Sequence, residues 1–130
     1  MKKNFAILLI LFIASFVFAQ EQGQEDDDAA PLDTSVQVIV PEDQHTQNKT
    51  AQIRMEYIKG LDEMRIYYSC LEVSFKEDEA RETIRQCLTD FQLANNYYAY
   101  KYMRDDRLSY RKNSRGLRQA IYMSQVKFTR

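Results

Sequence analysis

The sequence predicts an all-α protein, either an antiparallel helical hairpin or a small three-helix bundle, on three observations. The chain has 130 residues but only three glycines and two prolines, so few residues interrupt a helix. Both prolines lie before residue 50, which leaves residues 51–130 without the strongest helix breaker. In that range apolar side chains recur at alternating spacings of four and three residues, as they do along one side of a helix.

Residues 1–19 are predicted to be a cleaved signal peptide. Lys2 and Lys3 precede an apolar stretch, residues 5–18, which only Ser15 interrupts. As a helix this stretch would extend about 21 Å, less than the ~30 Å thickness of a hydrocarbon core. Cleavage is expected after Ala19, and the first cysteine is Cys70, so the lipobox of a lipoprotein is missing. We therefore expect a periplasmic or secreted protein; the alternative is an uncleaved N-terminal anchor.

Residues 20–50 are predicted to be a disordered acidic arm. They hold both prolines and eight acidic residues against one basic residue, Lys49, and few apolar side chains. Within the arm a valine occupies every second position, at Val36, Val38 and Val40, which is typical of a short strand. Such a strand could bind the sheet edge of a partner, pack locally on the domain, or be part of a linker.

Residues 51–130 are predicted to be the helical domain. The first apolar stripe consists of Tyr57, Leu61, Met64, Tyr68, Leu71 and Phe75. The second consists of Ala80, Ile84, Cys87, Phe91, Ala94 and Tyr98. The first stripe predicts a helix of about 25 residues, and the second predicts a helix from about Asp78 to beyond Tyr102. Acidic residues at 77–79 and 82 suit the start of that second helix, because the N-terminal end of a helix is partly positive. A calcium site is not predicted there, because these residues lack the spacing and the glycine of a calcium-binding loop.

The last segment of the chain has two interpretations. Residues 113–116 have the composition of a turn. A third helix would place Leu117, Ala120, Ile121, Ser124 and Phe128 on one side. A strand would instead place Ala120, Tyr122, Ser124, Val126 and Phe128 on one side. We favour the helix, because a hairpin alone would leave one apolar side of the first helix uncovered.

The two cysteines predict a disulfide bond. Cys70 and Cys87 lie at equal distances in sequence from the expected turn at residues 76–79. In an antiparallel helical hairpin they would therefore face each other at the same height. An exported protein enters an oxidising compartment, where a pair of cysteines usually becomes a disulfide. Two free buried thiols are the alternative.

Charge is distributed unevenly along the chain, although the net charge is only −1. Residues 91–130 carry nine of the eighteen basic residues and only two acidic ones. The predicted partner-binding residues are Arg104, Arg107, Arg111, Arg115, Arg118, Tyr100 and Tyr102. The arginines follow each other at helical spacing, and the tyrosines can bury a large ring while keeping a polar tip in water. The alternative is an ordinary solvated basic face.

Catalysis is not predicted, since the sequence contains no phosphate-binding glycine loop, no metal-ligand spacing and only one histidine, His45. We expect no cofactor and no metal, and the predicted export argues against nucleic acid as a partner. The expected function is that of a non-enzymatic structural or adaptor protein of the bacterial envelope that binds another protein. The alternative is a binder of anionic surfaces, such as lipid headgroups or cell-wall polymers, through the arginine stripe.

Overall fold

The computed structural model describes residues 30–130, and this range contains six strands, one α-helix and two short 3-10 helices. The elements in chain order are β1 (Gln37–Ile39), β2 (Gln52–Ile58), η2 (Lys59–Leu61), β3 (Glu63–Leu71), η3 (Glu72–Ser74), α1 (Glu77–Ala94), β4 (Ala99–Tyr102), β5 (Arg107–Lys112) and β6 (Arg118–Thr129). The predicted signal peptide and the first part of the predicted arm lie outside the described residues. Among the described residues no helix is long and apolar enough to span a membrane.

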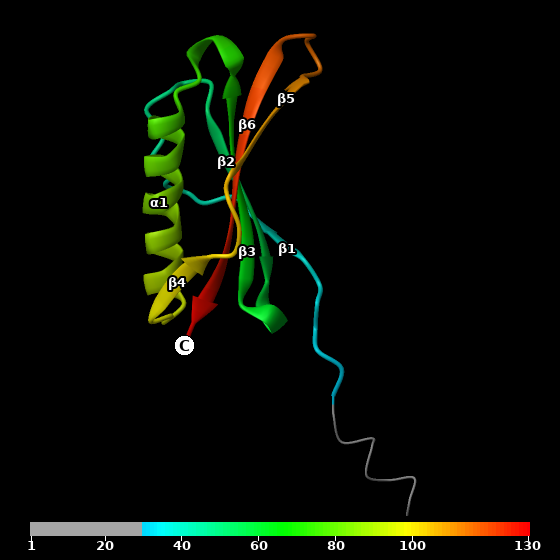
Figure 1. The fold of residues 1–130 in the computed structure, drawn as a ribbon, viewed down its shortest axis with the longest axis vertical. Coiled ribbons are helices and arrows are strands. Elements are labelled where there is room, and N and C mark those ends of the chain that lie inside the picture. Colours follow the sequence, from blue (N-terminus) through cyan, green and yellow to red (C-terminus); the bar gives the residue numbers. More distant parts are fainter. Residues whose placement is uncertain (1–29) are drawn as a thin grey trace, which may run out of the picture. The chain divides into compact units, whose positions relative to one another are not determined.

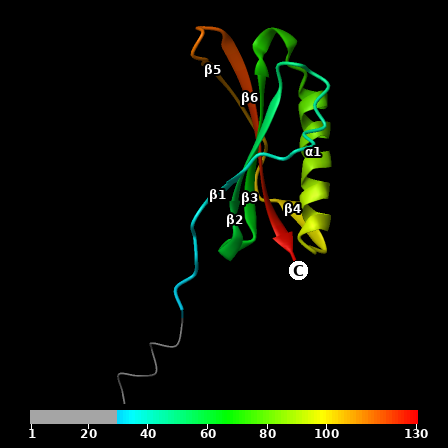
Figure 2. The ribbon, with the colours of Figure 1, turned by 180° about the vertical axis from the view of Figure 1, so that it is seen from behind.

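The strands form one antiparallel sheet in the order β1-β2-β3-β6-β4, and β5 also pairs with β6. β4 pairs with the end of β6 and β5 with its beginning, so together they form one interrupted edge of the sheet. Figure 1 shows α1 lying along one side of the sheet, and Figure 2 shows the same arrangement from behind. The architecture of residues 30–130 is therefore a sheet with a single α-helix on one face.

The all-α prediction, with its helical hairpin or three-helix bundle, is wrong. The first predicted helix is instead the antiparallel pair of β2 and β3. Buried residues alternate along both strands, as Ile53, Met55 and Tyr57 do in β2. Met64 and Tyr68 belong to the predicted helical stripe and also to the buried side of β3, because a separation of four residues fits both periods. The period of two was present in the sequence but was hidden by this overlap.

A tight turn separates β2 from β3 where the predicted helix would have continued. Asp62 has a φ of 54°, in the left-handed region, and its backbone N–H donates to the Lys59 carbonyl at 3.2 Å. Gly60 passes so close to the backbone of Asp33 that a Cβ at this position would clash with the Asp33 carbonyl. The chain can reverse here because Gly60 has no side chain.

The helix α1 corresponds to the second predicted helix, but it is shorter. It begins at Glu77 and ends at Ala94, and Asn96 follows with a φ of 58°. Its buried residues are Ala80, Thr83, Ile84, Cys87 and Leu88. Tyr98, the last residue of the predicted stripe, lies beyond the helix and is 83% exposed.

The C-terminal segment is strand β6, so the strand interpretation is the right one and the preferred third helix is wrong. The residues that the strand interpretation places on one side are all buried: Ala120, Tyr122, Ser124, Val126 and Phe128. Leu117, which motivated the helix, is 47% exposed and lies outside β6. β6 pairs with β3 on one side and with β4 and β5 on the other, so it is a central strand.

The compact unit begins at Leu32, so it includes residues of the segment predicted as an arm. β1 pairs with β2 and places Ile39 opposite Met55. The chain then continues along α1, where the Gln44 side chain accepts a hydrogen bond from the Ile53 backbone N–H at 3.0 Å. Residues 37–39 thus pack locally on the domain, one of the three interpretations left open by the alternating valines.

The predicted disulfide is absent, and Cys70 and Cys87 are both free and buried. The prediction placed the two cysteines at the same height because it assumed that both lie on helices of a hairpin. Cys70 instead lies near the end of strand β3. Cys87 lies ten residues after the start of α1, about 15 Å along its axis. The cysteines are therefore at different levels of the molecule.

Aromatic side chains fill the core between the sheet and α1. Phe91 of α1 makes an edge contact with Tyr57 of β2 at 4.8 Å between ring centroids. It also contacts Phe128 of β6 at 5.2 Å, and Phe128 stacks on Tyr97 at 4.7 Å. These rings attach the helix to the sheet. Among residues 30–130 no element covers the opposite face of the sheet.

Candidate partner-binding surface

The two faces of the sheet are distinguished by strand register. Side chains alternate between the faces along each strand, and directly paired residues of neighbouring strands lie on the same face. The face that contains the buried residues Met64 and Val126, paired across β3 and β6, packs against α1. We call the opposite face, which carries Tyr67 and Met123, the open face.

A row of four paired residues crosses the middle of the open face. Arg54 of β2 lies opposite Tyr67 of β3, which lies opposite Met123 of β6. Met123 in turn lies opposite Arg107 of β5. This central row therefore places an aromatic and an apolar side chain between two arginines.

The open face carries an excess of basic side chains. Its basic residues are Arg54, Arg65, Lys101, Arg107, Arg111 and Lys127. Its acidic residues are Glu56 and Glu63. Basic residues therefore outnumber acidic ones three to one on this face of a chain whose net charge is −1.

Glu56 is already engaged within the open face. Its carboxylate lies 3.0 Å from Arg54 and 3.5 Å from Arg65, and it accepts a hydrogen bond of 2.9 Å from the Tyr67 hydroxyl. Among residues 30–130, Arg107 and Arg111 make no ion pair within 4.0 Å. These two guanidinium groups are exposed and available to an outside carboxylate.

Partly exposed apolar side chains lie between the charges. They are Ile58, Tyr67, Leu71, Ile121 and Met123. Ile121 lies opposite Ser69 and Ser109, next to the central row. The face thus combines an apolar centre with a basic surround, which is the usual composition of a protein-binding surface rich in arginine, tyrosine and methionine.

The structure disperses the seven residues predicted to bind a partner. Arg107 and Arg111 both lie on the open face, four residues apart along β5, with Ser109 between them on the same face. Tyr100 and Tyr102 lie on the side of β4 that faces α1. Arg104 and Arg115 lie in the connections before and after β5. The predicted helical stripe of arginines does not exist, because these residues are on strands and loops.

Arg118 is occupied on the helix side of the sheet. Its guanidinium lies 2.9 Å from Glu72 and 4.9 Å from the centre of the Tyr110 ring.

The sequence analysis did not identify Arg54, Tyr67 and Met123 as members of a binding surface. A period of two applied to residues 52–58, 63–71 and 118–129 would have placed these residues on the side opposite the core.

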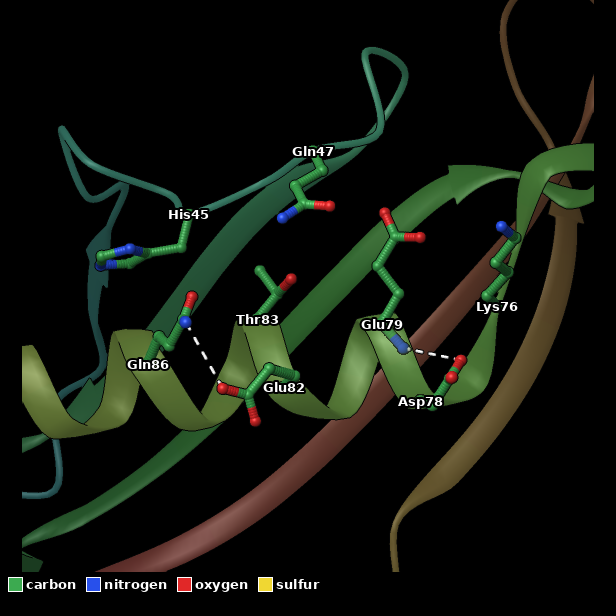
Figure 3. Close-up of a pocket in the computed structure, with 8 residues that line it drawn as sticks. All are labelled: His45, Gln47, Lys76, Asp78, Glu79, Glu82, Thr83 and Gln86. Atoms are coloured by element: carbon green, nitrogen blue, oxygen red, sulfur yellow. Dashed lines mark hydrogen bonds between the residues drawn. The ribbon is translucent and has the colours of Figure 1, made fainter.

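A second concave region is the polar groove along the first half of α1, shown in Figure 3. It has a volume of about 370 Å³ and contains Glu79, Glu82 and Lys76, with His45 at one end. Arg85 donates hydrogen bonds to Glu82 and thereby lowers the pKa of its carboxyl. Within residues 30–130 no group of three or more His, Cys, Asp or Glu side chains is arranged to hold a metal ion. These acidic residues are accounted for by the start of the helix.

The buried titratable groups next to the core keep their protons at neutral pH. Burial raises the pKa of the Cys87 thiol to about 11 and that of the Tyr68 phenol to about 12. The Tyr68 hydroxyl makes no hydrogen bond within the described part of the chain. Neither group is activated as a nucleophile in this environment.

Comparisons with known proteins give no relative: no family model, curated protein or solved structure matches this chain.

Proposed function

We propose that this protein has a non-enzymatic role and binds the acidic surface of another protein through its open face. The central row carries the proposal, because it places Tyr67 and Met123 between the guanidinium groups of Arg54 and Arg107. Buried aromatic and apolar contacts supply most of the affinity of a protein complex. Surrounding charges steer the encounter and select the partner.

The apolar centre favours a protein partner over a purely anionic surface. A lipid headgroup layer or a cell-wall polymer would be recognised mainly by charge, and the half-buried Ile121, Met123 and Tyr67 would add little. On a protein partner these three side chains would be covered. The experiment therefore has to distinguish a protein partner from an anionic lipid or polymer surface.

We also propose that this binding takes place outside the cytoplasm, in the bacterial envelope or the secreted fraction. The support is the predicted signal peptide at residues 1–19, with Lys2 and Lys3 before the apolar stretch. That segment lies outside the described residues, so the proposal rests on the sequence alone.

The experiment compares two double charge reversals of equal size. Arg54→Glu with Arg107→Glu changes both ends of the central row. The matched control, Lys112→Glu with Arg115→Glu, makes the same change in net charge away from the open face, because Lys112 pairs with Arg118 on the helix side and Arg115 lies in the β5–β6 turn. Each tagged protein is incubated with an extract of the cells that produce it, and captured proteins are quantified at low and high salt.

We expect the open-face variant to lose captured partner by about tenfold, which corresponds to roughly 1.4 kcal/mol, while the control behaves as wild type. Equal loss in both variants would contradict the proposal, because it would show that only total charge matters. Vesicles containing anionic phospholipid serve as the second probe. Binding to them that disappears at high salt, without a captured protein, would establish the alternative instead.

A further inference from the structure

A cavity distinct from the polar groove lies on the helix side of the sheet, between α1 and the segment that follows β1. Its volume is about 430 Å³, which is within the range of about 300–1,000 Å³ for small-molecule sites. Met55 and Cys87 are buried in its wall, and they are 2% and 1% exposed. Phe91 and Ile39, both partly buried, also belong to the apolar lining, together with Pro41 and Ala94. The interior therefore favours an apolar group.

The mouth of this cavity is acidic. Glu42, Asp43 and Asp90 all line it and are all exposed. No lysine or arginine is among its lining residues. Glu42 makes no ion pair within 4.0 Å among residues 30–130. The cavity thus joins an apolar interior to a rim of three carboxylates.

His45 is the nearest basic group to this rim. One ring nitrogen lies 2.5 Å from Asp90 and the other lies 3.7 Å from Asp43. A protonated His45 neutralises at most one of the three carboxylates, so the rim remains negative in both states of the imidazole. The contact with Asp90 also attaches residues 43–45 to α1, so it helps to hold the cavity in shape.

We propose that this cavity binds a small organic ammonium ion whose apolar body enters between Ile39 and Phe91 and whose charged nitrogen stays at the carboxylate rim. The apolar body removes surface from water, and the ammonium group donates hydrogen bonds to carboxylates that face solvent. A neutral ligand of the same shape would gain only the first contribution, and an anionic one would be repelled. This inference is independent of the function proposed for the open face.

The experiment titrates the full folded protein with three ligands that share a phenyl-alkyl body: 2-phenylethylamine, 2-phenylethanol and 3-phenylpropanoate. Binding is followed by NMR shifts of backbone amides along α1 and residues 39–43. We expect the amine to bind about tenfold more tightly than the alcohol, and the carboxylate to cause no shift. Equal affinity of amine and alcohol, or no saturable shift with the amine, would overturn the proposal.

Three variants locate the site. Ala94→Leu extends a side chain from an exposed cavity-lining position and is compatible with a helix, so it should abolish amine binding. Glu42→Gln removes a rim charge and should weaken the amine several-fold while leaving the alcohol unchanged. Glu63→Gln is the control, since Glu63 lies on the open face. The pair Arg54→Glu with Arg107→Glu should leave amine binding intact, so failure of either proposal is recognised separately.

Discussion

Arg107 of β5 lies directly opposite Met123 of β6, on the face of the sheet away from α1. Met123 is half-buried and Arg107 is exposed, so the arginine borders the apolar centre of the open face. A guanidinium beside an apolar strip can pair with a carboxylate while its stem covers apolar surface. This relationship makes the edge formed by β5 part of the open face rather than an isolated basic hairpin.

Asp106 is expected to stabilise the fold by attaching the connection between β4 and β5 to strand β6. Its carboxylate accepts hydrogen bonds from the Tyr122 hydroxyl at 2.7 Å and from the Ser124 hydroxyl at 2.8 Å. Both donors are buried, so Asp106→Ala leaves two hydroxyl groups without an acceptor. We expect unfolding in urea to show a loss of about 1–3 kcal/mol. The neighbouring exposed Asp105→Ala should change stability by no more than about 0.5 kcal/mol; similar effects of the two would contradict this role.

The cysteines should behave as free, protected thiols. Protein unfolded without a reducing agent and then alkylated should gain two modifying groups by mass spectrometry, because Cys70 and Cys87 are not bonded. In the native state at pH 8, alkylation should be slow, since both thiols are buried and burial raises the pKa of Cys87 to about 11. An unreduced protein that gains no mass would show that the disulfide forms after all.

The pair of His45 and Asp90 predicts a pH dependence of stability. The hydrogen bond to Asp90 raises the pKa of His45 above its ordinary value of 6.5. Protonated His45 is thus favoured in the folded state, and its contribution is complete below about pH 6.5 and is lost as the pH rises through the folded-state pKa. Melting temperatures of wild type and His45→Gln should therefore differ more at pH 6 than at pH 8.5. A difference that is constant over this range would rule out the charged pair.

Processing of the N-terminus tests the predicted signal peptide. Cleavage after Ala19 should give a mature protein that begins at Gln20 and is recovered outside the cytoplasm. N-terminal sequencing of the protein from cell fractions provides the measurement. A chain that begins at Met1 and is recovered in the membrane fraction would support the uncleaved anchor.

The sequence predicted the helix α1 but not the sheet, and Met64 and Tyr68 show why. Both fit a helical stripe and a strand, and the long-range pairing of β3 with β6 is not visible in a local window. In α1 the same method succeeded, because the separation of three between Ile84 and Cys87 does not fit a period of two and no alternating apolar pattern competes with it. In β2 and β3 such an alternating pattern was present beside the helical one, so the local spacing alone could not decide.

The candidate site was predicted only in part for the same reason. Basic residues at 104–118 were recognised, but their faces depend on strand alternation, which separates Arg107 and Arg111 from Lys112 and Arg118. Arg54 lies about fifty residues earlier in the chain, and only the order β2-β3-β6-β5 brings it into the central row. A surface built from four strands requires the topology before its members can be grouped.

Photo-crosslinking from two adjacent positions of β5 measures directly whether a protein partner binds the open face. Ser109 lies on the open face opposite Ile121, whereas Tyr110 lies opposite Ala120 on the helix side, and both are exposed. A photoreactive side chain at residue 109 should form a protein adduct in extracts of the producing cells. That adduct should be lost in the Arg54→Glu with Arg107→Glu background, and residue 110 should give little adduct. Equal adduct yields from both positions, or a yield at residue 109 that survives the charge reversal, would contradict binding through the open face.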